Sequence, residues 1–201
     1  LQTRSVEFGM KYRVPIHVRS SFDESEGSWV VPEDSTMEQV VVRAVTYDRN
    51  DARISVIGVQ DQPGVAAKVF ETLSAEEIVV DMIIQNASQD RTRTDLTFTV
   101  PKANASDAVR LMQKVAGDLG ATEVKVDKNI TKVSVVGVGM RSHSGVAAKM
   151  FKTLSNAGVN IQMISTSEIK ISVVIDDAYS ELAVRLLHTA FGLDGPVAAN
   201  A

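Results

Sequence analysis

Residues 64–74 read GVAAKVFETLS, and residues 145–155 read GVAAKMFKTLS. The two segments agree at nine of eleven positions, and the agreement continues on both sides of them. The corresponding flanking stretches are 54–59 (ISVIGV) with 133–138 (VSVVGV), 78–83 (IVVDMI) with 159–164 (VNIQMI), and 108–112 (AVRLM) with 183–187 (AVRLL). Self-similarity over this length indicates that the chain contains one structural unit in two copies.

Each copy predicts the element order β-α-β-β-α. A run rich in β-branched residues predicts a strand, and the following helix places Val65, Val69, Phe70 and Leu73 on one face. The expected elements are first strands at 54–59 and 132–138, second strands at 78–86 and 159–166, third strands at 94–100 and 169–175, and closing helices at 104–117 and 178–190. This order is the ferredoxin-like α+β plan without its last strand.

The two missing strands have candidates elsewhere in the chain. Glu123–Asp127 follows the first copy and predicts its fourth strand. Nothing comparable follows the second copy, but Val40–Tyr47 precedes the first copy just as 120–127 precedes the second. We therefore expect Val40–Tyr47 to pair with the second copy. The first domain (48–127) is then inserted into the second (40–47 plus 128–191), and 192–201 forms a flexible tail.

Residues 1–39 differ from the repeats. Val6–Tyr12 predicts the end of a helix and residues 14–19 a short strand, whereas the polar, acidic segment Ser21–Gln39 with Gly27 and Pro32 predicts a linker. A fragment of this size is too short to bury a core of its own. We interpret it as the trailing edge of a larger domain.

Composition excludes several classes of function. The 201 residues are 44% hydrophobic and 23% charged, with a net charge of -4, and no basic patch indicates nucleic acid or a membrane surface. The absence of cysteine excludes disulfides and thiolate sites and is compatible with the cytoplasm. No phosphate-binding loop, nucleophile arrangement or metal-ligand spacing is present, so the residues predict no catalytic site and no metal site.

The strand-to-helix corner that precedes each repeated helix indicates a binding function. The first N–H groups of a helix lack internal partners and carry the positive end of its dipole, so a carboxylate is stabilised there. Gly64 and Gly145 let a ligand approach the backbone, and Asp61 suits an ammonium group beside that carboxylate. The corner therefore favours a free α-amino acid. Ordinary helix capping by Asp61 or Gln62 before Pro63 is the alternative. The polar strand ends 85–88 and 165–168 either contact a ligand or form turns.

Several motifs resemble those of ACT domains, and the whole chain resembles the regulatory part of a bacterial aspartokinase. They are Asp61–Ala66 (DQPGVA), Asp81–Asn86 (DMIIQN), Thr94–Thr99 (TDLTFT), Lys132–Gly137 (KVSVVG) with 140–143 (MRSH), and 159–161 with 164–169 (VNI, ISTSEI). Residues 1–21 resemble the tail of the family's kinase domain. The resemblance implies a β subunit or a carboxy-terminal fragment that senses threonine, lysine or both. ATP and Mg²⁺ would bind the kinase domain, so no cofactor is expected in this chain.

The resemblance also implies two effector sites between the repeats. One joins Asp61, Gly64, Ala66 and Gln85 to Asn160 and Ile161, and the other joins Val79, Val80, Asp81 and Ser88 to the second corner and strand end. The complete candidate set is Asp61, Pro63, Gly64, Val65, Ala66, Val79, Val80, Asp81, Gln85, Asn86, Ser88, Ser144, Gly145, Val146, Ala147, Asn160, Ile161, Thr166, Ser167 and Glu168. Ser144 departs from the proline usual in the family, which makes the second corner less rigid.

Exposed edge strands predict that the chain pairs with itself as a homodimer. The resemblance adds a catalytic aspartokinase α subunit as a partner if this chain is a β subunit, and neither nucleic acid nor a membrane is expected. An assembly subunit that joins other chains without binding an effector is the alternative function.

Overall fold

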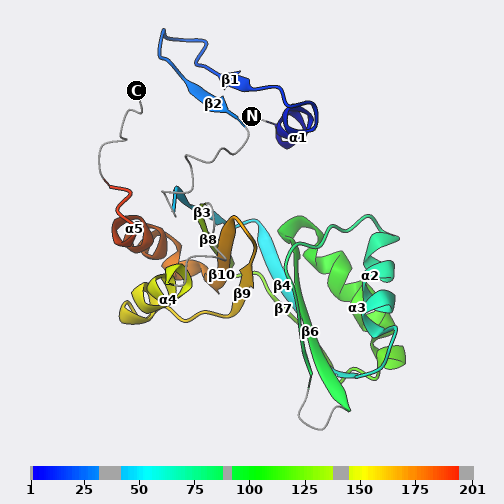
Figure 1. Cartoon of the computed structure of the whole chain (residues 1–201). Coiled ribbons are helices and arrows are strands. Elements are labelled where there is room, and N and C mark those ends of the chain that lie inside the picture. Colours follow the sequence, from blue (N-terminus) through cyan, green and yellow to red (C-terminus); the bar gives the residue numbers. More distant parts are fainter. Residues whose placement is uncertain (1, 32–41, 88–91, 138–144, 195–201) are drawn as a thin grey trace. The chain divides into compact units, whose positions relative to one another are not determined.

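The computed structural model describes residues 2–31, 42–87, 92–137 and 145–194 (Figure 1). The chain forms two compact units, Leu1–Val40 and Val41–Ala201. The expected tail lies mostly outside the described residues. Leu193, however, packs against the core of the second domain, so the tail begins later than residue 192.

The amino-terminal unit contains a helix and a two-stranded antiparallel sheet. Its elements are α1 (Thr3–Tyr12), β1 (Ile16–Val18) and β2 (Ser28–Val30). The expectation of a linker across Ser21–Gln39 is therefore wrong for the residues of β2. Trp29 stacks on His17 with ring centroids 4.0 Å apart, a cross-strand contact that stabilises the pairing.

The first domain is a four-stranded antiparallel sheet with two helices on one face (Figure 1). Its elements are β4 (Asp51–Gln60), α2 (Val65–Ser74), β5 (Ile83–Ala87), β6 (Arg93–Pro101), the short 3₁₀ turn η2 (Lys102–Asn104), α3 (Ala105–Leu119) and β7 (Glu123–Asp127). The strand order is β5-β6-β4-β7, so the strand expected at 123–127 closes the sheet beside β4.

The second domain repeats this plan with one strand taken from before the first domain. Its elements are β3 (Ala44–Asp48), β8 (Ile130–Val136), α4 (Val146–Asn156), β9 (Met163–Thr166), β10 (Lys170–Asp176), η3 (Asp177–Tyr179) and α5 (Ser180–Ala190). The order is β3-β8-β10-β9. Since β3 pairs with β8, the expected insertion of one ferredoxin-like domain into the other is confirmed.

The first helix of each repeat, α2 and α4, buries the face that its apolar spacing predicts. In α2 the buried residues are Val65, Val69 and Leu73, and Phe70 packs edge-to-face on Phe98 of β6 with centroids 5.6 Å apart. In α4 the corresponding residues Val146, Met150 and Leu154 are buried. Each domain thus has its own core between its sheet and its helix pair.

The second strand of each domain is shorter than predicted. Strands were expected from residues 78 and 159, but β5 begins at Ile83 and β9 at Met163. The residues between helix and strand still contribute to the cores, because Ile78 and Val159 are both buried. Backbone pairing also begins slightly before each strand, because the Asp81 N–H donates to the Thr99 carbonyl at 3.2 Å and the Gln162 N–H donates to the Val174 carbonyl at 2.8 Å.

A third apolar cluster joins the two domains. It contains Met82 of the first domain with Ile130, Met163 and Val174 of the second, and Ile84 packs against it. Met82 and Met163 occupy equivalent places in the repeats. Val173 belongs to the core of the second domain while Val174 belongs to this cluster, so both faces of β10 are buried.

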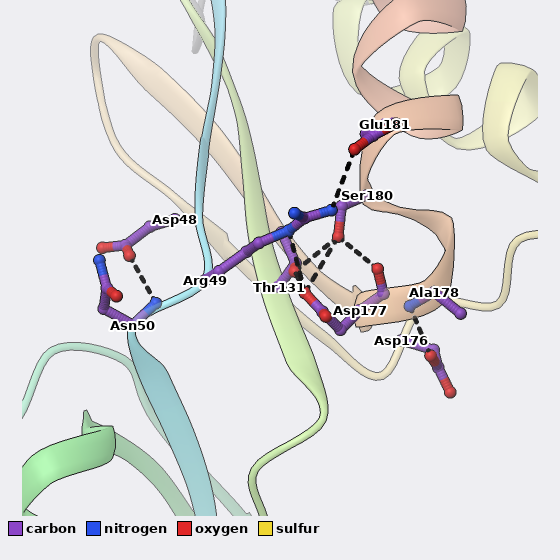
Figure 2. A network of polar contacts seen from close by, with 9 residues as sticks. All are labelled: Asp48, Arg49, Asn50, Thr131, Asp176, Asp177, Ala178, Ser180 and Glu181. Atoms are coloured by element: carbon purple, nitrogen blue, oxygen red, sulfur yellow. Dashed lines mark hydrogen bonds and ion pairs between the residues drawn. The ribbon is translucent and has the colours of Figure 1, made fainter.

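The chain crosses between the two sheets at two equivalent turns. The Asn50 N–H donates to Asp48 Oδ1 at 2.8 Å between β3 and β4, and the Asn129 N–H donates to Asp127 Oδ1 at 2.9 Å between β7 and β8. Figure 2 shows the first turn, from which Arg49 reaches Asp177 at 3.1 Å. The sequences Asp48-Arg49-Asn50 and Asp127-Lys128-Asn129 correspond in the two repeats. Each forms one of the two crossings between the domains.

Candidate functional site

The first corner connects the end of β4 to the start of α2. Residues 61–64 are exposed, whereas Val65 is buried and anchors the helix to the core. Gly64 is the N-cap residue, with φ 95° and ψ -13°, a left-handed conformation that suits glycine. The N-cap is thus a glycine, and within the described residues neither Asp61 nor Gln62 caps this helix with its side chain.

An open pocket of about 520 Å³ lies at this corner. Its lining residues are Asp61, Gln62, Pro63, Gly64, Val65, Ala66 and Gln85. The structure thus gathers six predicted residues in one place and adds Gln62, which the sequence analysis had treated only as a possible cap. Asn86 does not line this pocket, although it follows Gln85 in β5 and its carbonyl accepts a hydrogen bond from the Thr94 hydroxyl at 2.8 Å.

The pocket combines groups that suit the two charges of an amino acid. The amino-terminal end of α2 favours a carboxylate, because its dipole is positive there. The Val65 N–H donates to the Gln62 carbonyl at 3.4 Å, so the next N–H groups of the first turn are the donors left for a ligand. The Asp61 carboxylate favours a cation, and the Gln85 amide can donate or accept. A Cβ placed on Gly64 would meet nothing within 4 Å, so the approach to this backbone is open.

Asn160 and Ile161 line a different pocket, of about 450 Å³. Its other residues are Phe151, Ser155, Gly158 and Val159, all from the second domain. Asp61 and Gln85 therefore do not share a pocket with Asn160 and Ile161 in the described chain. The resemblance implied that these groups face each other in one site, whereas in the single chain they line two separate pockets.

The ACT domain family matches residues 54–115 and 133–191. The regulatory subunit of aspartate kinase from Thermus thermophilus, in its ligand-free form, is 44% identical with a TM-score of 0.72, covering 75% of this chain and 99% of that chain. A structure of aspartokinase alpha and beta subunits is 49% identical with a TM-score of 0.70, covering 75% of this chain and 98% of that chain.

The chain belongs to the aspartokinase family, as a regulatory region of two ACT domains. An aspartate kinase of Stutzerimonas stutzeri (strain A1501) is 51% identical over 197 residues, which cover 98% of this chain and 48% of that protein. The chain spans about half the length of the curated relatives it matches. Among the described residues of this regulatory chain, no helix is long and apolar enough to cross a membrane.

The second predicted site is only partly brought together. Ser88 and Ser144 lie outside the described residues. In the first ACT domain Val79 is exposed, but Val80 packs against the core and Asp81 is bonded to Lys132. In the second ACT domain Gly145, Val146 and Ala147 form the start of α4. Thr166 ends β9, and Ser167 and Glu168 follow it.

Lys132 joins the two ACT domains through carboxylates. Its Nζ lies 2.8 Å from Asp51 Oδ2 and 2.6 Å from Asp81 Oδ2, with Asp48 Oδ2 at 3.9 Å. Burial acts to lower the pKa of Lys132, but the hydrogen bonds and charges of Asp51 and Asp81 outweigh it and raise that pKa above its ordinary value. The ammonium group is therefore held charged at the domain junction.

The sequence analysis missed this junction. Asp81 was assigned to an effector site, and Lys132 and Asp51 were not singled out. The only available signal was the repeated turn beside them, whose place in the chain predicts a crossing between domains. Asp81 lies two residues before β5, the strand that carries Gln85 to the corner pocket.

Beside this junction, the crossing turn contributes a second polar network (Figure 2). Asp177 Oδ1 accepts a hydrogen bond from the Thr131 hydroxyl at 2.6 Å and lies 3.1 Å from Arg49 Nε. The Thr131 bond and the Arg49 charge, opposed by partial burial, lower the pKa of Asp177. This network fastens the start of α5 to the crossing between β3 and β4.

Proposed function

We propose that this chain senses an end-product amino acid, threonine or lysine or both, and transmits its binding to an aspartokinase catalytic domain. The regulated reaction is phosphoryl transfer from ATP to the side-chain carboxylate of L-aspartate, the first step of lysine, threonine and methionine biosynthesis in the cytoplasm. The catalytic domain is either the preceding part of a longer chain or a separate α subunit.

The observation that carries this proposal is the uncapped start of α2 beside Asp61. The α-carboxylate of the effector accepts hydrogen bonds from the first N–H groups of α2, and its ammonium group lies against Asp61. The Gln85 amide forms a hydrogen bond with the polar group of the effector's side chain. This arrangement selects for both charges of a free amino acid, which distinguishes it from a site for a simple anion.

A second copy of the chain completes the site in this proposal. The pocket at Asp61 is open, and the pocket at Asn160 and Ile161 lies on the other ACT domain of the same chain. The edge strands β5 and β9 carry exposed Ile83 and Ile164, which suit pairing between chains. A homodimer that places the Asp61 pocket of one chain against the Asn160 pocket of the other chain would enclose the effector.

Transmission requires that the effector bind two arrangements of the protein with different affinity. A coupling free energy of about 1–3 kcal/mol is typical of such regulation and is sufficient for feedback inhibition. Gln85 lies in β5, and Asp81, two residues before that strand, accepts a hydrogen bond from Lys132 of the second ACT domain. Movement of this segment on binding would therefore reach both domains.

Calorimetry with threonine and with lysine tests the proposal on the full chain. We expect at least one of them to bind, and Asp61→Ala to weaken that binding by about tenfold, as expected for the loss of one charge-assisted contact. Asp107→Ala is the matched control, because Asp107 pairs with Arg110 on the exposed face of α3. The effector site is contradicted if neither amino acid gives binding heat, or if Asp61→Ala and the parent bind the effector with equal affinity.

The same edge strands favour one other function, an assembly subunit that holds catalytic chains together without an effector. Analytical sedimentation with and without threonine and lysine distinguishes the two. An oligomer that does not change with either amino acid, in a chain that shows no binding heat, favours assembly. A change in oligomeric state on addition of the effector favours the sensor.

A further inference from the structure

We infer that Arg93 and Asp95 of β6 are positioning residues for the effector site, because they hold a β-bulge at Gly58 that turns Asp61 toward the start of α2. This inference rests on the proposed function and names residues that do not line the pocket. Neither side chain reaches the ligand in this account. Each acts through the backbone of β4.

The bulge is visible in the register of β4 against β6. Val56 pairs with Leu96 and Val59 pairs with Thr94, so Ile57 and Gly58 together oppose the single residue Asp95. Gly58 has φ 66°, the left-handed conformation typical of a bulge glycine. A Cβ at Gly58 would lie 2.7 Å from the Thr122 hydroxyl oxygen, so this position has room only for glycine.

The extra residue changes which side chains face the helices. Before the bulge, Ala52, Ile54 and Val56 are fully buried, and after it the buried residue is Val59. Since side chains alternate along a strand, Asp61 shares the face of Val59. The Asp61 N–H donates to the Thr92 carbonyl at 3.0 Å, which continues the alternation to this residue. Without the bulge, Asp61 would point to the opposite face, away from α2.

Side chains of β6 satisfy the backbone groups that the bulge frees. The Gly58 N–H donates to Asp95 Oδ1 at 2.8 Å. Arg93 Nη1 donates to the Gly58 carbonyl at 2.6 Å and to the Gly120 carbonyl at 3.1 Å. Arg93 therefore ties the bulge to the residue that ends α3, and the two side chains together fix both polar groups of Gly58.

The second ACT domain does not share this arrangement. The register of β8 against β10 runs without a shift from Ile130 to Val136, and the Gly137 N–H donates to the Ile169 carbonyl in place of a side chain. Lys170 stands where the first domain has Asp95. Gly64 follows Gly58 by six residues, whereas Gly145 follows Gly137 by eight. The bulge thus distinguishes β4 from the described part of its counterpart β8.

Calorimetric titration of the full chain with threonine, and with lysine in parallel, tests the inference. We expect Asp95→Ala to weaken effector binding by about tenfold, because Asp61 is no longer held beside α2. Asp95→Asn restores affinity to within about twofold, since its amide oxygen still accepts from the Gly58 N–H. Asp107→Ala, which removes an exposed carboxylate elsewhere, leaves affinity unchanged. Rescue by asparagine separates positioning from a simple loss of charge.

The outcomes separate this inference from the function on which it rests. If the parent chain binds neither threonine nor lysine, the proposed function fails and this inference falls with it. If the parent binds but Asp95→Ala has the parent's affinity, only the positioning role is overturned. If Asp95→Ala does not fold, as judged by loss of the parent's circular dichroism spectrum, Arg93→Met provides the test. Weakened effector binding by folded Arg93→Met supports the positioning role, and unchanged binding contradicts it.

Discussion

At the scale of single residues, Gly64 determines whether the corner stays open. Its φ of 95° disfavours any side chain, although a Cβ would meet nothing within 4 Å. We expect Gly64→Ala to lower the free energy of unfolding by about 1 kcal/mol through backbone strain alone. The new methyl group also lies at the pocket, so effector affinity falls as well. Chemical denaturation and calorimetry measure the two effects separately.

Gly117 provides the matched control for this substitution. It lies within α3, is exposed, and its Cβ would also meet nothing within 4 Å. Alanine is favoured over glycine inside a helix by up to about 1 kcal/mol, so Gly117→Ala should stabilise the chain. Equal effects of Gly64→Ala and Gly117→Ala on stability would show that the conformation of the corner is not what the structure describes.

At the scale of elements, the two repeated helices end in the same way with different residues. In α2 the Ile78 N–H returns to the Leu73 carbonyl at 3.0 Å, and in α4 the Val159 N–H returns to the Leu154 carbonyl at 3.0 Å. The turn residue is Glu77 with φ 55° in the first copy and Gly158 with φ 71° in the second. Glu77 thus occupies a left-handed position that glycine fills in its counterpart.

This difference predicts opposite effects of substitution. Glu77→Gly should raise the free energy of unfolding by about 1 kcal/mol, because it relieves the strain of a left-handed side chain. Gly158→Ala should lower that free energy by a similar amount, since its Cβ would meet nothing within 4 Å and only the backbone cost remains. Denaturant titration measures both, and a destabilising Glu77→Gly would contradict this account of the helix end.

The elements that the sequence predicts well are those with strong periodicity. The alternation in 54–59 and the spacing of Val65, Val69 and Leu73 led to the observed strand and helix. The bulge at Gly58 could not be predicted, because its signal is a contact between β4 and side chains of β6. The sequence also could not show which surfaces enclose a ligand, because the repeat shows which surfaces are equivalent and not which ones face each other.

At the scale of the whole molecule, Lys132 links the two ACT domains through the carboxylates of Asp48, Asp51 and Asp81. Its side chain is 15% exposed and that of Asp51 is 12% exposed. We expect Lys132→Met to lower the free energy of unfolding by about 2 kcal/mol at neutral pH, because the carboxylates lose their common partner. Lys125→Met is the control, since Lys125 forms an exposed pair with Glu123 and should change stability by less than about 1 kcal/mol.

The difference in unfolding free energy between the parent and Lys132→Met depends on pH with a defined sign. The pKa of Lys132 in the folded chain lies above its ordinary value of 10.5. The stabilising contribution is therefore complete below pH 10.5 and is lost as the pH rises through the raised pKa. Denaturation of the parent and Lys132→Met at pH 7 and above pH 10.5 should show the difference shrinking. A difference that grows with pH would contradict this role.

The most direct test of the central claim is a crystal structure of this chain grown with threonine, and with lysine in parallel. The account predicts an amino acid at the corner, with its carboxylate accepting from the first N–H groups of α2, its ammonium group beside Asp61, and Gln85 in contact with it. An amino acid bound elsewhere, with the start of α2 filled by one of the protein's own side chains, would contradict the claim.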